Sequence, residues 1–161
     1  MTIPEGWLDS WNGTWTSTKE LEDSKVMDEI LTIQGVSWMV RKAAAGVTPQ
    51  DELKLYREGD VLVLEVKRKS MAGETLRKWH LDGREVELNE QPPTGHVCVS
   101  WNVTDQDGVL VQETKEVSGA WSSKAEWSVV VENGVPFHYR KINFQGKGKL
   151  LRLVQKFKKT A

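Results

Sequence analysis

The sequence predicts an all-β fold in which ten antiparallel strands run up and down around a barrel, with two helices between the first strand and the second. From Asp51 onward, Gly, Asn and Asp punctuate the chain about every ten residues, and polar and apolar side chains alternate between these turns. Alternation with short turns is typical of antiparallel hairpins between sequential neighbours. A meander of this many strands exposes two edges unless it closes, so we expect a barrel.

Turn residues set the limits of the expected strands. Asp82-Gly83 and Glu132-Asn133-Gly134 contain residues that tolerate a positive φ, as tight hairpins require. Only the linker at residues 89–95, which contains Pro92 and Pro93, is long enough to interrupt the pairing of neighbours. The ten predicted strands are Gly13–Leu21, Glu52–Tyr56, Val61–Lys69, Thr75–Leu81, Glu85–Leu88, His96–Val103, Val109–Val117, Trp121–Val131, Phe137–Asn143 and Lys149–Lys158.

One stretch, at about residues 23–46, follows a helical period instead. Its apolar residues Val26, Met27, Ile30, Leu31 and Ile33 recur at the spacing of one helix face. Gly35 ends this helix and Ser37 can cap a second one, which continues to Gly46. We therefore expect a helical hairpin between the first strand and the rest, within a single domain at residues 1–161.

Composition and charge exclude several classes of protein. The 161 residues carry 22 Lys and Arg against 23 Asp and Glu, which lacks the basic excess of a nucleic-acid-binding protein. The single cysteine, Cys98, cannot form an internal disulfide, and the first residues resemble no signal peptide. No apolar run approaches the roughly 18 residues of a membrane span. We expect a cytoplasmic, monomeric protein with no nucleic-acid partner.

The interior of the predicted barrel is open to two interpretations. Only 39% of the residues are hydrophobic, and strands such as Val61–Lys69 carry polar side chains on both faces. A small packed barrel is filled by its own side chains, whereas a wider one encloses a cavity. Ten strands and few apolar residues favour a partly wet interior that can accept a ligand, and the alternative is a filled barrel whose polar residues face solvent.

Several segments, in this order, resemble the intracellular lipid-binding proteins, which comprise the fatty-acid-binding and cellular retinoid-binding proteins of the calycin group. They are Gly13-Thr14-Trp15, the helix pair that ends in Arg41-Lys42-Ala43-Ala44, Glu58-Gly59-Asp60 followed by Val61–Glu65, and Asp107–Gln112. The resemblance runs from about Trp11 to Phe157 and is dense over residues 11–69. It implies a clam-shaped barrel of ten strands, a helical lid over a portal, and a cavity for a fatty acid, a retinoid or a similar amphiphile.

The chain departs from the family in the residues expected to bind a carboxylate. Family members commonly use an Arg-x-Tyr pair on the last strand, and here Arg152 matches the arginine while Val154 replaces the tyrosine. Trp121–Val131 offers no second arginine. Arg152 is the candidate anchor for an acidic head group, and an outward position is its alternative. Tyr139 and Arg140 lie on opposite faces of their strand, so one of them is expected to face the barrel interior.

The tryptophans supply the other candidate site residues, because eight of the 13 aromatic residues are Trp. Trp15 is expected to close the barrel floor, with Trp7 and Trp11 before it. An indole has a large rigid apolar face, so Trp38, Trp79, Trp101 and Trp127 are candidates to line the cavity or, alternatively, an external patch. At the portal we expect Met39, Arg41 and Lys42. The positive charges of Arg41 and Lys42 can attract anionic ligands or an anionic membrane surface.

Two functions compete on these observations, beside a third interpretation as a structural or interaction protein whose barrel is filled by Trp side chains. The first is a carrier that binds and transports a hydrophobic small ligand without chemistry or a cofactor. The second is an enzyme on a calycin-type barrel, of the isomerase or luciferase kind, in which a cavity histidine or Glu65 acts as a general base. The histidines are His80, His96 and His138, and their spacing matches no metal site and no catalytic constellation. We therefore expect a carrier and assign no catalytic or metal-binding residue.

Overall fold

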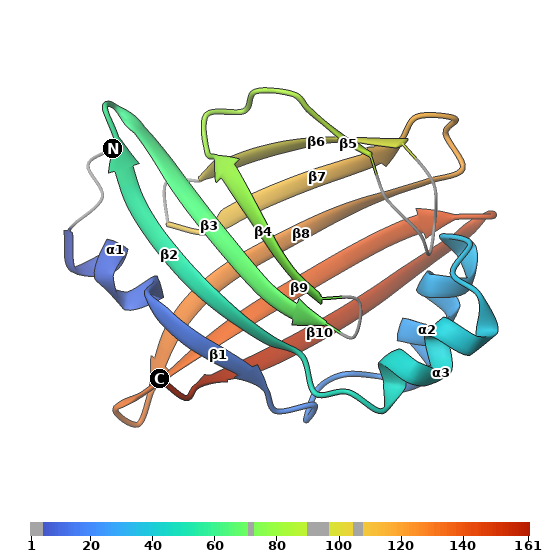
Figure 1. Ribbon diagram of the computed structural model, residues 1–161, viewed down its shortest axis with the longest axis horizontal. Coiled ribbons are helices and arrows are strands. Elements are labelled where there is room, and N and C mark those ends of the chain that lie inside the picture. The colour runs from blue at the N-terminus through green and yellow to red at the C-terminus, as the bar shows by residue number, and fades with distance from the viewer. Residues whose placement is uncertain (1–4, 71–72, 90–96, 105–107) are drawn as a thin grey trace.

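The computed structural model describes residues 5–70, 73–89, 97–104 and 108–161. Ten antiparallel strands form one curled sheet in the order β4-β3-β2-β1-β10-β9-β8-β7-β6-β5, which confirms the predicted fold class (Figure 1). In the described residues the edge strands β4 and β5 do not pair with each other, and an isolated bridge between Asp82 and Val103 connects the end of β4 to β6. The strands are β1 (Gly13–Ser17), β2 (Gln50–Glu58), β3 (Val61–Ser70), β4 (Gly73–His80), β5 (Val86–Asn89), β6 (Val97–Thr104), β7 (Leu110–Glu116), β8 (Trp121–Glu132), β9 (Val135–Gly146) and β10 (Lys149–Lys159).

The longest hairpins close through two-residue turns with positive φ at both positions. Asn133 and Gly134 have φ values of 51° and 79° between β8 and β9, and Lys147 and Gly148 have 49° and 73° between β9 and β10. This geometry matches the right-handed twist of paired strands. With a tight turn at each end, β9 extends from Val135 to Gly146 and is longer than the predicted strand Phe137–Asn143. The linker with Pro92 and Pro93 lies outside the described residues.

The predicted helical hairpin is present as α2 (Ser24–Ile33) and α3 (Trp38–Ala45). Asp23 caps α2 by accepting hydrogen bonds from the Lys25 and Val26 amides, and Ser37 caps α3 as expected. Lys19 adopts a positive φ of 58° before this hairpin, so β1 ends at Ser17 rather than at the predicted Leu21. The helices cover one end of the barrel (Figure 1).

A third helix, α1 (Glu5–Trp11), was not expected, and it lies at the opposite end of the sheet (Figure 1). Its Leu8 and Trp11 are buried in the main core cluster together with Trp15, and the Trp15 indole donates to the Trp11 carbonyl over 2.9 Å. The three residues close that end, as the sequence suggests for Trp15 and Trp11. In the described residues no helix combines the length and apolarity that a membrane crossing requires.

Strand alternation decides which side chains face the barrel interior. Along β2, Asp51, Leu53 and Leu55 are buried while Glu52 and Lys54 are exposed. The inner residues form two clusters, one at the floor around Trp11, Trp15 and Phe157, and one beneath the lid. The lid cluster comprises Ile30, Cys98, Trp121, Phe144 and Leu153.

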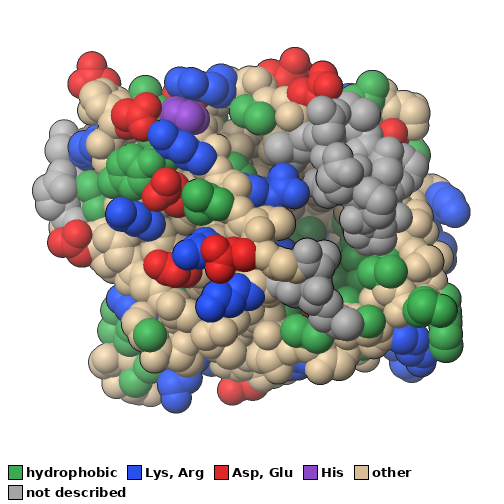
Figure 2. All heavy atoms as spheres, in the orientation of Figure 1, with side chains coloured by type: hydrophobic (Ala, Val, Ile, Leu, Met, Phe, Trp, Pro, Cys, Tyr) green, Lys and Arg blue, Asp and Glu red, His purple; other side chains and the backbone are tan. Residues whose placement is uncertain are grey.

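The inner wall is not covered completely. Gln112, Ser123 and Ile142 face inward and are only partly buried. Figure 2 shows this face of the molecule hollowed beside the residues that are not described, with hydrophobic side chains deep in the hollow. These three side chains are therefore partly accessible on the inner face of the sheet.

Candidate functional site

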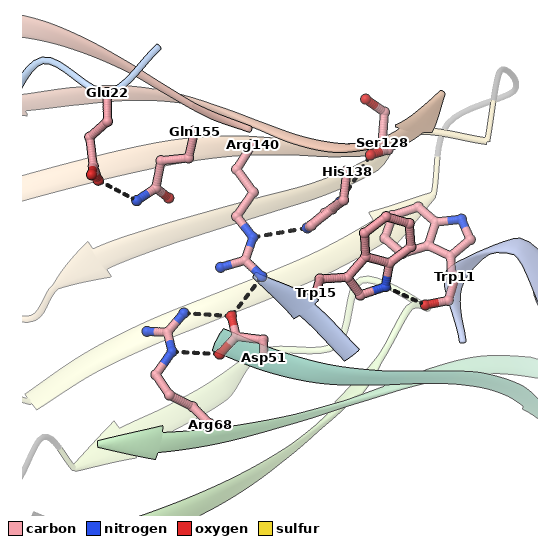
Figure 3. A network of polar contacts seen from close by, with 9 residues as sticks. All are labelled: Trp11, Trp15, Glu22, Asp51, Arg68, Ser128, His138, Arg140 and Gln155. Carbon is pink, nitrogen blue, oxygen red and sulfur yellow. Dashed lines mark hydrogen bonds and ion pairs between the residues drawn. The ribbon is translucent and has the colours of Figure 1, made fainter. Parts of the chain in front are cut away.

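A cluster of charged and polar side chains from the three strands β2, β3 and β9 lies on the inner wall (Figure 3). Asp51 on β2 is fully buried, and both of its oxygens accept hydrogen bonds from Arg68 on β3, each over 2.8 Å. Arg140 on β9 is only 2% exposed and donates from one Nη to Asp51 over 2.7 Å. The same arginine donates from Nε to His138 Nε2 over 2.9 Å. One buried carboxylate thus connects two arginines from opposite sides of β1.

Strand pairing explains why these residues meet. Asp51 and Arg68 are directly opposite each other in the β2–β3 ladder, and a directly opposed pair is close enough for a bidentate ion pair. Asp51 is also opposite Trp15 on β1. Arg140 reaches Asp51 from the other side, with its guanidinium 3.8 Å from the Trp127 ring centre and 4.1 Å from that of Phe157. These aromatic faces favour the cation electrostatically and exclude water from it.

The ionisation of the cluster follows from burial and pairing. Burial alone would raise the pKa of Asp51, but the hydrogen bond from Arg68 and the charges of both arginines outweigh it and lower this pKa to about 2. Burial lowers the pKa of Arg140 to about 10, so its guanidinium stays charged at neutral pH. The hydrogen bond to Asp51 raises the pKa of Arg68.

His138 completes the cluster as a neutral ring. Because its Nε2 accepts from Arg140, the proton lies on Nδ1, which donates to the Ser128 carbonyl over 2.9 Å. Burial, followed by the charge of Arg140, lowers the pKa of His138 well below 6.5. Two arginines, one aspartate and a neutral histidine give this cluster one excess positive charge.

The excess charge has unused hydrogen-bond donors. Arg140 employs Nε and one Nη in the contacts above, and Arg68 employs Nε and one Nη. Figure 3 shows the remaining Nη of each arginine directed away from Asp51, on the same side of the cluster. A planar anion such as a carboxylate matches donors of this kind.

The neutral His138 makes stability depend on pH. In the unfolded chain the histidine binds a proton below about pH 6.5, whereas in the folded protein the ring stays neutral. The contribution of the neutral ring to the free energy of unfolding is therefore present above that pH and is lost as the pH falls. We expect the free energy of unfolding to fall by about 1.4 kcal/mol per pH unit between about pH 6 and pH 5. Urea unfolding of His138→Gln should lack most of this slope, and His80→Gln should retain it. An unchanged slope in His138→Gln would contradict the assignment.

The structure places the expected anchor on the outside. Arg152 is exposed on β10, between the inward-facing Leu151 and Leu153, and Val154 lies on the same outer face. Tyr139 also faces outward, where its hydroxyl donates to Glu132 over 2.8 Å. Its neighbour Arg140 is the one that faces inward. The anchor at Arg152 is therefore not supported, because strand alternation directs its side chain to solvent.

The candidate tryptophans divide between the two faces. Trp127 is buried on the inner wall, and Trp79 packs edge-on against it with ring centres 5.0 Å apart. Trp101 faces outward, since it alternates with the buried Asn102. Trp38 is 64% exposed on α3. Two of the four tryptophans thus lie on the inner wall.

The three residues expected at a portal lie on α3 and differ in their contacts. Met39 is 74% exposed, and the Lys42 ammonium lies 5.6 Å from the Trp38 ring centre. Arg41 instead joins the two lid helices, because it donates to Asp28 over 2.8 Å and to the Val36 carbonyl over 2.6 Å. Its charge is therefore largely satisfied within the lid.

Asp51 and Arg68 were missed as site residues. The signal was available, since Asp51 is in phase with Leu53 and Leu55, and Arg68 is in phase with Leu64 and Val66. A charged residue in the inward phase of each of two neighbouring strands predicts a buried ion pair. The described residues contain no group of three or more His, Cys, Asp or Glu side chains that could hold a metal ion.

Comparison with solved structures confirms the fold. A Schistosoma mansoni fatty acid binding protein in complex with arachidonic acid superposes with a TM-score of 0.64 at 16% identity, over 97% of this chain and 100% of that one. Human cRBP IV superposes with a TM-score of 0.61 at 19% identity, over 92% and 97%. The predicted resemblance to intracellular lipid-binding proteins therefore holds at the level of the fold. No protein-family model matches the chain, and a search of curated proteins found no significant match.

The same fold also occurs in an enzyme. A luciferase domain from the dinoflagellate Lingulodinium polyedrum superposes with a TM-score of 0.53 at 14% identity, over 91% of this chain and 41% of that one. Fold likeness alone therefore does not separate a carrier from an enzyme, and the side chains of the inner wall must decide between them.

Proposed function

We propose that this protein binds a hydrophobic small molecule with an anionic head group inside the barrel and carries it without chemical change. The observation that carries the proposal is the Arg140–Asp51–Arg68 cluster, which carries one excess positive charge: Trp127 and Phe157 cover Arg140, and the Arg68 side chain is 48% exposed. A desolvated cation is costly unless an anion pairs with it. A ligand carboxylate would supply that anion.

The apolar part of the ligand has suitable surface beside the cluster. Trp79, Val129 and Ile142 are only partly buried, and all three pack against the floor cluster. Ile142 also contacts the lid cluster, so apolar surface continues from the floor towards the lid. Transfer of an alkyl chain to such a surface contributes about 25 cal/mol for each Å² removed from water. Affinity therefore needs no covalent step.

The lid supports delivery as well as binding. Trp38 and Met39 project from α3 beside Lys42, which combines exposed apolar surface with positive charge. An indole and a lysine of this kind suit the headgroup region of an anionic membrane. We include transient contact with such a membrane in the proposal, together with a monomeric state and the cytoplasmic location expected from the sequence.

An enzymatic function receives less support from the groups named for it. Glu65 is opposite Lys54 and Lys78, on the outer face of β3. His80 is also on the outer face, 3.8 Å from Glu58. His138 is inside, but both ring nitrogens already have partners. His96 lies outside the described residues.

Titration with two lipids of equal chain length tests the proposal. Octadecanoate and octadecanol should each change the tryptophan fluorescence saturably, because Trp79 and Trp127 lie on the inner wall. At neutral pH and matched ionic strength, octadecanoate should bind about tenfold more tightly, as one charge-assisted hydrogen bond predicts. A response to neither lipid would overturn the proposed function, and equal affinities would overturn the anionic head group.

A further inference from the structure

A second polar region lies on the inner wall, on strands that do not contribute to the charged cluster. Pairing aligns Ser100 on β6 with Thr114 on β7 and Ser123 on β8. One step along the same face, Asn102 is opposite Gln112. These five uncharged side chains form the polar wall, which comprises Ser100, Asn102, Gln112, Thr114 and Ser123.

The polar wall faces the interior and not solvent outside the barrel. Gln112 and Thr114 lie on the same face of β7 as Leu110, which is 1% exposed and belongs to the main core cluster. Ser100 and Asn102 are each 2% exposed and in phase with the buried Cys98. Ser123 shares its phase on β8 with the buried Ala125 and Trp127. Polar groups thus occupy positions where a filled barrel would place apolar ones.

Asn102 is the most informative of these residues. Its Oδ1 atom is buried, and in the part of the chain that the structure describes it has no hydrogen-bond partner. A buried acceptor without a donor loses its hydration and gains nothing in return, so each such atom requires an explanation. The neighbouring Ser100 and Thr114 hydroxyls are 3.4 Å apart, at the long limit of a hydrogen bond, and are thus available to another partner.

We propose that the polar wall binds a hydroxyl group of the ligand, so that the cargo is a hydroxylated amphiphilic acid and not a plain fatty acid. This inference rests on the proposed function, because it assumes that a ligand occupies the barrel. A hydroxyl donates one hydrogen bond and accepts others. It can therefore donate to Asn102 Oδ1 while it accepts from a Ser or Thr hydroxyl or the Gln112 amide.

The chemistry of the wall favours an uncharged group. Its five side chains carry no formal charge, so a second carboxylate would be desolvated there without a cation. The wall is also well separated from the charged cluster. Arg140 is opposite Trp127 on β8, which is opposite Leu110 on β7, and Leu110 is opposite Thr104 on β6. Thr104 is two residues from Asn102 along β6. With about 4.8 Å per strand, these three strand steps separate Arg140 from Thr104 by about 14 Å along the sheet. One extended ligand can reach both.

Binding of octadecanoate and of a series of hydroxyoctadecanoates, with the hydroxyl at successive positions along the chain, tests the inference. The wild-type protein should prefer at least one hydroxylated isomer to octadecanoate by about tenfold. Asn102→Leu should lose this preference and still bind octadecanoate. The same substitution on the outer face, Asn143→Leu, is the matched control and should retain it. Because Asn102→Leu removes a buried unpaired acceptor, the ligand-free variant should melt at a temperature about 2–4 °C higher.

The outcomes separate this inference from the function on which it rests. If octadecanoate binds but no isomer is preferred, the hydroxyl site is wrong and the carrier function stands. An Asn102→Leu variant that keeps the full preference also overturns the site. Should Asn102→Leu fail to fold, Gln112→Leu tests the same wall, and an undiminished preference there contradicts the proposal. If no acid of the series binds, the proposed function itself fails.

Discussion

Asp51→Asn is expected to lower the free energy of unfolding by about 3–5 kcal/mol, because it leaves the buried Arg140 without its counterion. Asp51 is fully buried and Arg140 beside it is 2% exposed, so the loss falls on Arg140, whereas water can solvate the Arg68 side chain, which is 48% exposed. An asparagine amide can still accept one hydrogen bond, but it does not neutralise a charge. Urea unfolding at neutral pH measures the loss directly.

A surface carboxylate provides the matched control. Asp82 pairs with Arg84 in a similar fork, with contacts of 2.6–3.0 Å, but both side chains are partly exposed. Exposed pairs contribute little, so Asp82→Asn should leave stability nearly unchanged. Octadecanoate should restore more stability to Asp51→Asn than it adds to the wild-type protein, because its carboxylate can pair with the vacated arginines. A loss in Asp51→Asn no larger than in Asp82→Asn would contradict this account of the cluster.

The features that the sequence predicted best depend on local chemistry. Turn residues with positive φ, such as Asn133-Gly134, fix a hairpin whatever the rest of the fold does. The Ser37 cap and the helical spacing before it similarly predict the lid without knowledge of the barrel. Short turns force strands that are consecutive in the sequence to pair with each other. The sequence could therefore predict both the pairing of neighbouring strands and the fold class.

The faces of the last strands could not be predicted in the same way. Alternation shows which residues share a face but not which face is inside. On β10, Leu151 and Leu153 share one phase while Arg152 and Val154 share the other, and the resemblance to lipid-binding proteins favoured the phase with arginine. The apolar phase packs into the core, so burial of leucine outweighs the family pattern.

Tertiary contacts explain the remaining differences. The α1 helix has only seven residues, too few to be stable alone, and it forms because Leu8 and Trp11 are buried against the barrel. The Asp51–Arg140 contact joins residues 89 positions apart. No local pattern encodes such a pair, although the inward phase of Asp51 was visible in the sequence. Long-range contacts therefore determine the site more than the fold.

The central claim is that Arg140, and not Arg152, binds the acidic group of the ligand. Arg140 is buried with one Nη directed away from its partners, whereas Arg152 is exposed on the outer face. Loss of a charge-assisted hydrogen bond in a buried site corresponds to about tenfold to a hundredfold in affinity. Arg140→Gln should therefore weaken octadecanoate binding by this factor and leave octadecanol binding nearly unchanged. Arg140→Lys, which retains the charge without the planar fork, should lose less.

The affinity of octadecanoate for Arg140→Gln and Arg152→Gln, determined side by side with octadecanol as the neutral reference, is the most direct measurement. We expect Arg152→Gln to bind both lipids as the wild-type protein does, and Arg140→Gln to lose its preference for the acid. An Arg140→Gln variant that is folded and binds octadecanoate with wild-type affinity, or a loss of affinity confined to Arg152→Gln, would contradict the claim.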